Sequence, residues 1–276
     1  MKTFRDPAKL QQWCRECRLK GRRLAIVPTM GYLHEGHLSL IEAAKRRGAD
    51  EIVVSVFVNP VQFCPGEDYE KYPRDEKADC AKCRKAGATA VFFPTPTTMY
   101  LDRHSVYVNE EDLSRGLCGA RRPGHFRGVC TVVAKLFNLT HPNFAVFGQK
   151  DYQQSQIIRR MVRDLNFDLD VVVAPIVREP SGLARSSRNT YLSEDERKKA
   201  LAISSGLFAL RDSLAAKRPM SLRQLSARLE KAGLRVDYVS CVDAETLEPC
   251  AKPKKGACVL VAAYCGKTRL IDNVLL

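Results

Sequence analysis

The 276-residue sequence contains no apolar run long enough to cross a membrane. A membrane-spanning helix needs about 20 predominantly apolar residues, and every apolar stretch in this chain is far shorter. Residues 1–20 mix acidic, basic and glutamine side chains and lack the apolar core of an export signal. We therefore expect a cytoplasmic protein that has no membrane partner.

The sequence also has no low-complexity tract and no internal repeat. Hydrophobic residues make up 45% of the chain and charged residues 28%, which is ordinary for a folded protein. A chain of this length can bury a substantial core without disulfides or metals. The composition therefore argues against disordered and repeat architectures.

Eleven cysteines are present, an odd number that excludes complete internal pairing. Without an export signal, these cysteines are expected to be reduced thiols. Two C-x-x-C pairs, Cys14 with Cys17 and Cys80 with Cys83, raise the alternative of a structural zinc site. More than sixty residues separate the two pairs, and both lie in helix-like segments without the glycines of a zinc knuckle. Plain helical cysteines are the favoured interpretation.

The formal net charge of +14 raises the question of nucleic-acid binding. The basic residues are scattered, and neither an aromatic-rich RNA signature nor zinc-finger spacing is present. The excess of basic residues can instead be explained by a solvated basic surface and, in part, by anionic substrates. No nucleic-acid partner is expected.

Short apolar runs alternate with segments of helical periodicity through the first two thirds of the chain. Alternation of this kind predicts a mostly parallel sheet covered by helices on both faces, a Rossmann-like doubly wound α/β fold. Such sheets bind ligands beyond the carboxyl ends of their strands. The expected strands are 24–27, 51–58, 89–93, 144–147 and 169–173, and the expected helices are 6–19, 38–47, 75–85, 130–139 and 153–164.

The pattern changes after Asn189. Two helices are expected, the first capped by Ser193 and ending near 214 and the second over 221–231. Three strands follow, and they indicate a second, smaller α+β domain. The predicted domains are 1–177 and 178–276, and the three expected strands are 236–242, 258–264 and 268–274.

The most informative motif is Val27-Pro28-Thr29-Met30-Gly31-Tyr32-Leu33-His34-Glu35-Gly36-His37, at the junction of an apolar strand and a helix. Unpartnered N–H groups and the macrodipole make a helix start a natural site for a polyphosphate, and Gly36 allows close approach. Imidazoles at i and i+3 lie on one face and can donate hydrogen bonds to phosphate. The alternative is a pair of surface histidines on an ordinary helix.

This motif resembles the H-x-G-H signature of the nucleotidyltransferase superfamily, and in its longer P-T-M-G-x-L-H-x-G-H form it resembles the pantothenate synthetase family. Further blocks follow in that family's order, so the resemblance covers essentially the whole chain. They are 57–63, 72–74, 122–129, 147–154, 186–189 and the closing 268–273.

The resemblance implies ATP-dependent condensation of pantoate with β-alanine to pantothenate, through a pantoyl adenylate and with release of AMP and pyrophosphate. Neither step needs a protein nucleophile. Residues 1–177 would bind nucleotide and pantoate, and 178–276 would form a lid. Mg²⁺ would accompany the ATP phosphates, and a homodimer is expected because the family is commonly dimeric.

The resemblance also assigns roles to residues. His37 is expected to donate to the departing phosphates. The alternative for Lys150-Asp151 and for Ser186-Ser187-Arg188 is that they are ordinary polar residues of exposed loops. The alternative for Asn59 is that its buried side chain only satisfies the hydrogen bonds of a turn. The expected catalytic residues are His34, His37, Lys150, Ser186, Ser187 and Arg188. The further residues expected to bind ATP are Thr29, Met30, Gly31, Gly148, Gln149, Asp151, Val177 and Arg185. Gln62 and Gln154 are expected to bind pantoate, and Asn59 and His125 are expected to support that pocket.

Two positions depart from the family's pattern. Gln149 stands where the family usually has glutamate, so any role that needs a carboxylate there is in doubt. Arg185 stands where a small or apolar residue usually precedes the Ser-Ser-Arg group. Its side chain either adds phosphate affinity or points to solvent.

Two other functions are the rivals of the ligase. One is a nucleotidyltransferase that transfers AMP to a phosphorylated cofactor precursor, which would form pyrophosphate without an amine. The other is a tRNA- or DNA-binding protein built on a synthetase-like domain, which would show steep salt dependence. No anticodon-type domain follows in this sequence.

Overall fold

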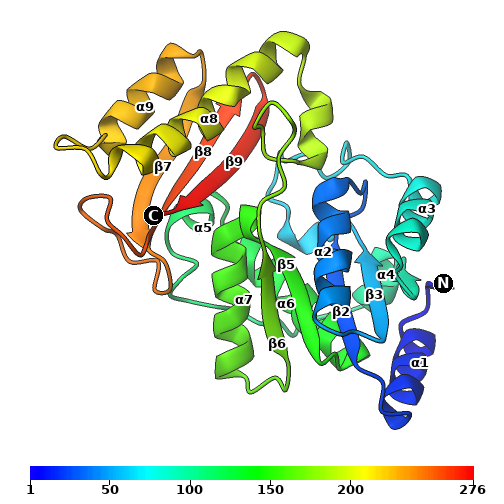
Figure 1. The fold of residues 1–276 in the computed structure, drawn as a ribbon. Coiled ribbons are helices and arrows are strands. Elements are labelled where there is room, and N and C mark those ends of the chain that lie inside the picture. The colour runs from blue at the N-terminus through cyan, green and yellow to red at the C-terminus, as the bar shows by residue number, and fades with distance from the viewer. The chain divides into compact units, whose positions relative to one another are not determined.

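A computed structural model describes all 276 residues, and the chain folds into two compact units (Figure 1). Unit 1 comprises Met1–Gln149 and Gln153–Pro175, and unit 2 comprises Lys150–Tyr152 and Ile176–Leu276. Each unit has its own sheet and is described separately below. No helix of the chain combines the length and apolar character needed to cross a membrane.

Unit 1 is built on a six-stranded parallel sheet in the order β1-β4-β3-β2-β5-β6. The chain starts the main sheet at β2 and adds β3 and β4 on one side before it returns to add β5 and β6 on the other. The topological switch therefore lies between β2 and β5, and the predicted doubly wound sheet is confirmed. The strands are β1 (Lys2–Phe4), β2 (Leu24–Thr29), β3 (Glu51–Val56), β4 (Ala90–Phe92), β5 (Phe144–Gly148) and β6 (Asp170–Ala174).

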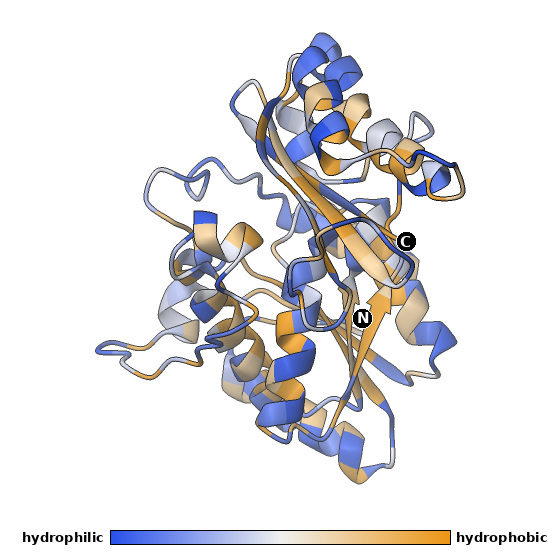
Figure 2. Cartoon of the chain, turned by 90° about the vertical axis from the view of Figure 1, so that its left-hand side faces the viewer, coloured by the Kyte–Doolittle hydropathy of each residue, from blue (hydrophilic) through white to orange (hydrophobic).

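Helices cover both faces of this sheet. On one face, α2 (Glu35–Arg46) and α3 (Glu76–Ala86) pack together, and on the other α1 (Pro7–Leu19) packs against α6 (His125–Thr140). The strands are hydrophobic along most of their length, whereas the helices carry hydrophilic outer faces (Figure 2). The other helical segments before β6 are α4 (Pro96–Met99), α5 (Leu117–Arg121), α7 (Tyr152–Asp164), η1 (Pro60–Gln62) and η2 (Gln149–Asp151), of which residues 150–152 belong to unit 2.

Two helices begin earlier than the sequence pattern predicts. Helix α2 begins at Glu35 instead of 38 because a histidine caps it, and histidine is not among the usual capping residues. Helix α6 begins at His125 instead of 130, after Gly124, whose φ of +80° and lack of a side-chain cap resemble an ordinary turn. The short edge strand β1 was not predicted either. Three residues are too few to show a period.

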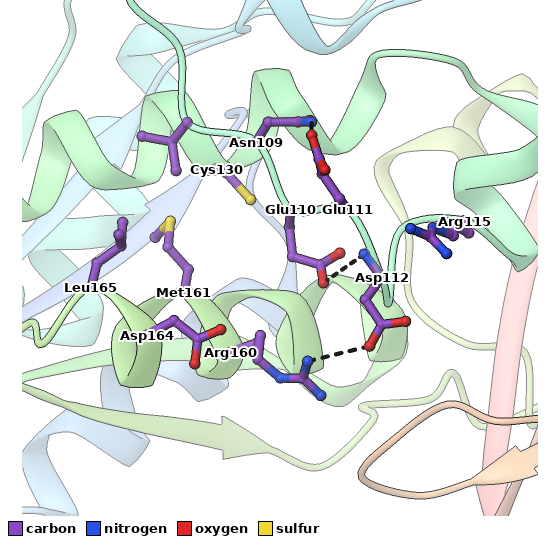
Figure 3. Close-up of a pocket in the computed structure, with 11 residues that line it drawn as sticks. Asn109, Glu110, Glu111, Asp112, Arg115, Cys130, Arg160, Met161, Asp164 and Leu165 are labelled. Atoms are coloured by element: carbon purple, nitrogen blue, oxygen red, sulfur yellow. Dashed lines mark hydrogen bonds and ion pairs between the residues drawn. The ribbon is translucent and has the colours of Figure 1, made fainter.

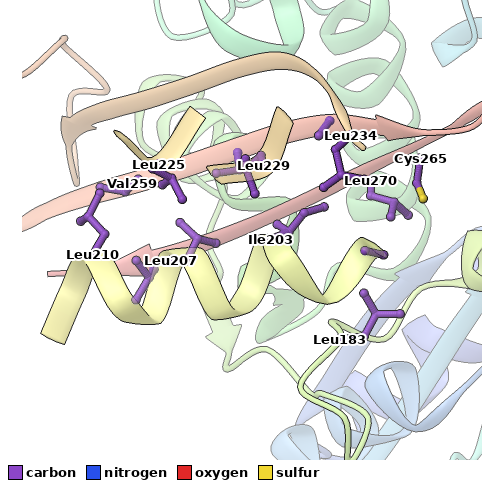
Figure 4. Close-up of a cluster of buried hydrophobic side chains, with 14 of the residues drawn as sticks. Leu183, Ile203, Leu207, Leu210, Leu225, Leu229, Leu234, Val259, Cys265 and Leu270 are labelled. Atoms are coloured by element: carbon purple, nitrogen blue, oxygen red, sulfur yellow. The ribbon is translucent and has the colours of Figure 1, made fainter. Parts of the chain in front are cut away.

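Unit 2 is a three-stranded antiparallel sheet in the order β7-β8-β9, covered by α8 and α9. Side chains from both helices and from the sheet form one apolar cluster, which includes Leu207, Leu225 and Val259 (Figure 4). Ser193 and Ser221 each form a capping box, which explains why both helices begin where the sequence predicts. The elements are η3 (Ser187–Tyr191), α8 (Glu194–Ser213), α9 (Leu222–Lys231), β7 (Arg235–Asp243), β8 (Ala257–Cys265) and β9 (Thr268–Leu275).

Candidate active site

The turn that follows β2 is fixed at its first residues by the neighbouring strand. The Thr29 hydroxyl donates to the carbonyl oxygen of Ser55 at 2.7 Å and accepts from the N–H of Gly31 at 3.2 Å. Gly31 has a φ of +88°, and a Cβ on it would lie 2.8 Å from Cγ1 of Val56. Only glycine fits this position, both for conformation and for space.

His34 and His37 cap the start of α2 reciprocally. Nδ1 of His34 accepts from the N–H of Gly36 at 3.1 Å, and the N–H of His34 donates to Nδ1 of His37 at 3.2 Å. The two ring centroids are 4.1 Å apart. Because each Nδ1 is an acceptor, each neutral ring carries its proton on Nε2. Both imidazoles are therefore held as Nε2–H donors beside the N-terminus of α2.

A chain of amide and hydroxyl groups sets the orientation of Gln62. The Tyr100 hydroxyl donates to Oδ1 of Asn59 at 2.7 Å, and Nδ2 of Asn59 donates to Oε1 of Gln62 at 3.0 Å. With its oxygen occupied, Gln62 turns its NH₂ group toward Sδ of Met30, 3.3 Å away. Asn59 is 1% exposed and Gln62 9%. The network therefore leaves Gln62 as a donor at the same end of the sheet as the histidine pair.

His125 supports this network from the start of α6. Its Nδ1 lies 2.8 Å from the carbonyl oxygen of Gln62, and its Nε2 lies 2.8 Å from Nη1 of Arg122. An arginine can only donate, so Nε2 is the acceptor and Nδ1 carries the proton. Arg122 in turn forms two hydrogen bonds with Glu67, at 2.6 and 2.8 Å. The close approach of α6 to η1 requires Gly128, where a Cβ would lie 2.7 Å from Cα of Gln62.

The adjacent glutamines of α7 have different surroundings. Gln153 is 3% exposed, and its side chain bonds to the backbone of Cys118, Leu113 and Gly116 at 2.8 to 2.9 Å. Gln154 is partly exposed and takes no part in the Asn59–Gln62 network. Gln153 is a structural residue that the sequence did not reveal, since its partners lie 35 or more residues away.

In unit 2, Lys150 and Asp151 lie beside the last strand. Nζ of Lys150 is 4.0 Å from Oδ2 of Asp151, which is a weak pairing. The carbonyl oxygen of Lys150 accepts from Nδ2 of the buried Asn273 at 3.1 Å. The backbone of Lys150 is thereby fixed to β9, while its ammonium group is held loosely.

Residues 177–185 form a short hairpin that leads into the Ser-Ser-Arg segment. The N–H of Arg185 donates to the carbonyl oxygen of Val177 at 2.9 Å, and Arg178 pairs with Ala184 across the hairpin. The base of the hairpin is anchored by Arg178, which forms two bonds of 2.6 and 2.9 Å to the buried Asp272. Ser186 then caps η3 by accepting from the N–H of Arg188 at 3.3 Å.

The Glu179 carboxylate is the common partner of several side chains around this segment. Its carboxylate accepts from Nδ2 of Asn189 at 3.1 Å and from Nη1 of Arg197 at 3.3 Å, and Nη1 of Arg185 lies 4.0 Å away. The Arg185 side chain is 31% exposed, so its guanidinium group lies near Glu179 and still reaches solvent. Ser187, in the same segment, is buried.

Comparison with known proteins decides the family. The family model described as pantoate-beta-alanine ligase matches residues 2–275. The chain belongs to the pantoate–β-alanine ligase family.

Individual relatives agree with this family over their full length. The pantothenate synthetase of Myxococcus xanthus is 54% identical, over 99% of this chain and 96% of the relative. The crystal structure of pantothenate synthetase from Thermus thermophilus superposes with a TM-score of 0.91 at 45% identity, covering 99% of both chains. The ligase from Francisella tularensis, solved with β-γ ATP and β-alanine, has a TM-score of 0.85 at 33% identity and covers 100% of this chain and 97% of its own. The chain is therefore an enzyme, a ligase of pantothenate biosynthesis.

The motif residues that mark this ligase family gather within each unit. In unit 1 the structure brings Met30, Asn59, Gln62 and His125 into one network, with the histidine pair at the end of the adjacent strand. Gly148 ends β5, and a Cβ on it would meet no atom within 4 Å. The sequence missed three supporting residues, Tyr100, Asp79 and Glu179, whose partners lie up to 47 residues away in the chain.

A cavity of about 430 Å³ lies elsewhere in unit 1, between residues 108–115 and α7 (Figure 3). None of the expected ligase residues lines it. Two of its carboxylates already have partners, since Glu110 accepts from the backbone N–H groups of residues 112–114 and Asp112 pairs with Arg160 at 3.3 Å. This cavity is not the candidate active site.

The C-x-x-C pairs lie on α1 and α3, as helical cysteines. Burial raises the pKa of both Cys14 and Cys83 to about 12, so these thiols stay protonated. No three His, Cys, Asp or Glu side chains of the ligase are grouped so that they could hold a metal ion.

Proposed function

We propose that this ligase condenses pantoate with β-alanine at the expense of ATP, through a pantoyl adenylate. A pantoate carboxylate oxygen attacks the α-phosphorus, and pyrophosphate leaves. The β-alanine amine then attacks the acyl carbon, loses a proton, and displaces AMP as the amide bond forms. The carboxylate is a poor electrophile with no good leaving group, and adenylation supplies one.

The observation that carries this proposal is the fixed tautomer of the histidine pair. Both Nδ1 atoms are occupied, so His34 and His37 can offer only Nε2–H donors. Neutral donors that are already oriented stabilise the charge that develops on phosphate oxygens without reorganisation in the transition state. They stand at the start of α2, where the helix macrodipole favours an anion. We assign His37 to the departing phosphates and His34 to ATP.

The remaining nucleotide contacts are proposed from the family pattern and from the local geometry. Cationic and hydroxyl side chains would bind the triphosphate, and backbone groups would bind the rest of the nucleotide. Gly148 would allow the ribose to approach, and Val177 would meet the adenine through its backbone. The proposed triphosphate contacts are Lys150, Arg185, Ser186, Ser187 and Arg188, and the further nucleotide contacts are Thr29, Met30, Gly31, Gln149 and Asp151.

Pantoate would be bound by Gln62 and Gln154. The NH₂ group of Gln62, which faces Met30, suits a carboxylate or hydroxyl oxygen, and the orientation of this amide follows from Asn59. His125 has a supporting role, because its two ring nitrogens already contact Gln62 and Arg122. The carbon skeleton of pantoate would lie against the neutral amides of Gln62 and Gln154, so no charged side chain would be buried against it without a partner.

Magnesium would arrive with ATP, as MgATP. The chain has no cluster of metal-ligating side chains, so phosphate oxygens and water would hold the ion. The Francisella tularensis ligase was solved with an ATP analogue and β-alanine, which supports these two substrates here. A homodimer, a cytoplasmic location and a lid role for residues 178–276 stay predictions.

The test is a product assay with ATP, Mg²⁺ and pantoate, run with and without β-alanine. We expect AMP, pyrophosphate and pantothenate in equal amounts only when all substrates are present. ADP and phosphate would indicate an acyl phosphate and overturn the proposal. Pyrophosphate release that needs a phosphorylated cofactor precursor and no amine would instead identify a nucleotidyltransferase.

A further inference from the structure

A buried carboxylate lies directly behind the turn that carries the histidine pair. Asp79 is on the first turns of α3, is 1% exposed, and has no role in the mechanism above. Its two oxygens divide between two consecutive amides. Oδ2 accepts from the N–H of Tyr32 at 2.8 Å, and Oδ1 accepts from the N–H of Leu33 at 2.7 Å.

These two amides belong to a strained turn. Gly31 and Tyr32 both have positive φ, +88° and +51°. A left-handed conformation is unfavourable for an ordinary residue such as tyrosine, so it persists only where the surroundings impose it. Asp79 supplies that constraint, because its two carboxylate oxygens accept from both N–H groups and are held in place by helix α3.

Lys82 completes the contact from the next turn of α3. Its Nζ donates to the carbonyl oxygen of Leu33 at 2.6 Å, and its ammonium group lies 5.9 Å from the centre of the Tyr32 ring. Helix α3 therefore holds both amides and one carbonyl of the dipeptide Tyr32–Leu33. It also places a cation beside a carboxylate whose pKa is raised by burial and lowered by the amide bonds, with a net increase.

The dipeptide immediately precedes the histidine cap. The N–H of His34 is the donor that engages Nδ1 of His37, so the direction of this N–H sets the His37 ring. We infer that Asp79 is a positioning residue, which fixes the backbone of residues 31–33 so that His34 and His37 present their Nε2–H groups to the nucleotide phosphates. The phosphate contact rests on the proposed function, whereas the orientation of the rings does not.

The primary test is Asp79→Asn, which keeps size and removes one acceptor. The amide NH₂ group would face one of the two N–H donors, so one of the two bonds is lost and the turn relaxes. Misplacing reacting groups by about 1 Å can lower rates about 100-fold, so we expect kcat/KM for ATP to fall about 10- to 100-fold. Pantoate binding without ATP, measured by calorimetry, should stay within about twofold because the Gln62 network does not touch Asp79.

The matched control is Asp75→Asn, the same substitution four residues earlier on α3. Asp75 caps the helix by accepting from the N–H of Ala78 at 2.9 Å, and asparagine caps equally well. We expect unchanged kinetics for this variant. If Asp79→Asn does not fold, Lys82→Met is the second variant, because it removes the bond to the carbonyl oxygen of Leu33. We expect kcat/KM for ATP to fall about threefold in this variant while pantoate binding stays unchanged.

Long-range ¹H–¹⁵N spectra of the imidazoles give a readout that needs no turnover. In the parent protein without ligand both histidines should show the Nε2–H tautomer, and in Asp79→Asn His37 should show a mixture. If the parent enzyme fails to make pantothenate, the proposed function is wrong, but these spectra still decide the role of Asp79. Unchanged tautomers, or equal losses in ATP kinetics and pantoate binding, would overturn the inference.

Discussion

The two segments proposed to bind phosphate are held in different ways. Residues 29–37 of unit 1 are positioned by directional hydrogen bonds from backbone N–H groups to Asp79 and to the imidazoles. In residues 177–189 of unit 2, ion pairs are added to the hydrogen bonds of the hairpin, and they centre on Glu179 and on the Arg178–Asp272 pair. Hydrogen bonds to amides fix the angle of a donor, and ion pairs fix chiefly where a charge lies. We infer that the first segment serves the transition state and the second serves nucleotide affinity.

The largest expected effect comes from His37. In His37→Asn the side-chain oxygen can still accept from the N–H of His34, but the Nε2–H donor is gone. We expect kcat to fall about 100- to 1000-fold, as for loss of one preorganised donor, with KM for ATP nearly unchanged. Steady-state kinetics measure both constants.

The control for this variant is His141→Asn. His141 ends α6 with a φ of +42°, a conformation that asparagine tolerates. This variant should retain full activity. A His37→Asn enzyme that loses ATP affinity but keeps its kcat would contradict the inference that residues 29–37 serve the transition state.

Glu179→Gln tests the second segment. The neutral amide can keep the bond with Asn189 but loses its charge toward Arg185 and Arg197. We expect KM for ATP to rise about tenfold with less than about a threefold change in kcat, since about 1.4 kcal/mol of binding corresponds to tenfold. Glu230→Gln, at an exposed position of α9, is the control. A fall in kcat at constant KM would assign the segment to catalysis.

Tyr100→Phe sharpens the comparison at the pantoate end of unit 1. It removes the hydroxyl that donates to Asn59 and leaves the ring in place. Loss of one such bond costs about 1 kcal/mol, so KM for pantoate should rise about fivefold while KM for ATP stays constant. Tyr107→Phe keeps its ring contacts with Arg127 and His104 and serves as the control. Equal changes for both substrates would mean that Tyr100 does not act through Gln62.

The smallest effect concerns stability. Burial raises the pKa of Glu67, but the hydrogen bond and charge of Arg122 outweigh it, and the net pKa is lowered. A lowered carboxyl pKa stabilises the fold above the unfolded-state value, about 4.3, and this stabilisation is lost as pH falls through the folded-state pKa. Glu67→Gln should therefore lower the unfolding free energy by about 1–2 kcal/mol at about pH 7, and the difference should shrink below about pH 4 in denaturant titrations. A difference that does not depend on pH would contradict the ion pair.

The sequence predicts this fold well because its signals are local. The apolar strands, the helical periods and the serine caps of α8 and α9 are each visible within a few residues. The early start of α6 is not, because Gly124 at its cap gives no side-chain signal and looks like a turn. The extent of β1 depends on pairing with β4, about 88 residues later in the chain.

The site shows the same division between local and distant signals. The histidine pair forms a contiguous motif, and its capping geometry follows from three-residue spacing. Asp79, Glu179 and Tyr100 have no motif of their own. Asp79, for example, is a buried acid on a basic helix, which looks like a surface residue in sequence. Their roles depend on partners up to 47 residues away, which only the folded chain brings into contact.

The most direct test of the account follows the pantoate oxygen. Pantoate labelled with ¹⁸O in its carboxylate is incubated with ATP, Mg²⁺ and β-alanine, and the nucleotide is analysed by mass spectrometry. If the carboxylate attacks the α-phosphorus, each AMP will carry one ¹⁸O atom and the other will stay in the amide carbonyl of pantothenate. Unlabelled AMP, or label found in inorganic phosphate beside ADP, would contradict the adenylate mechanism.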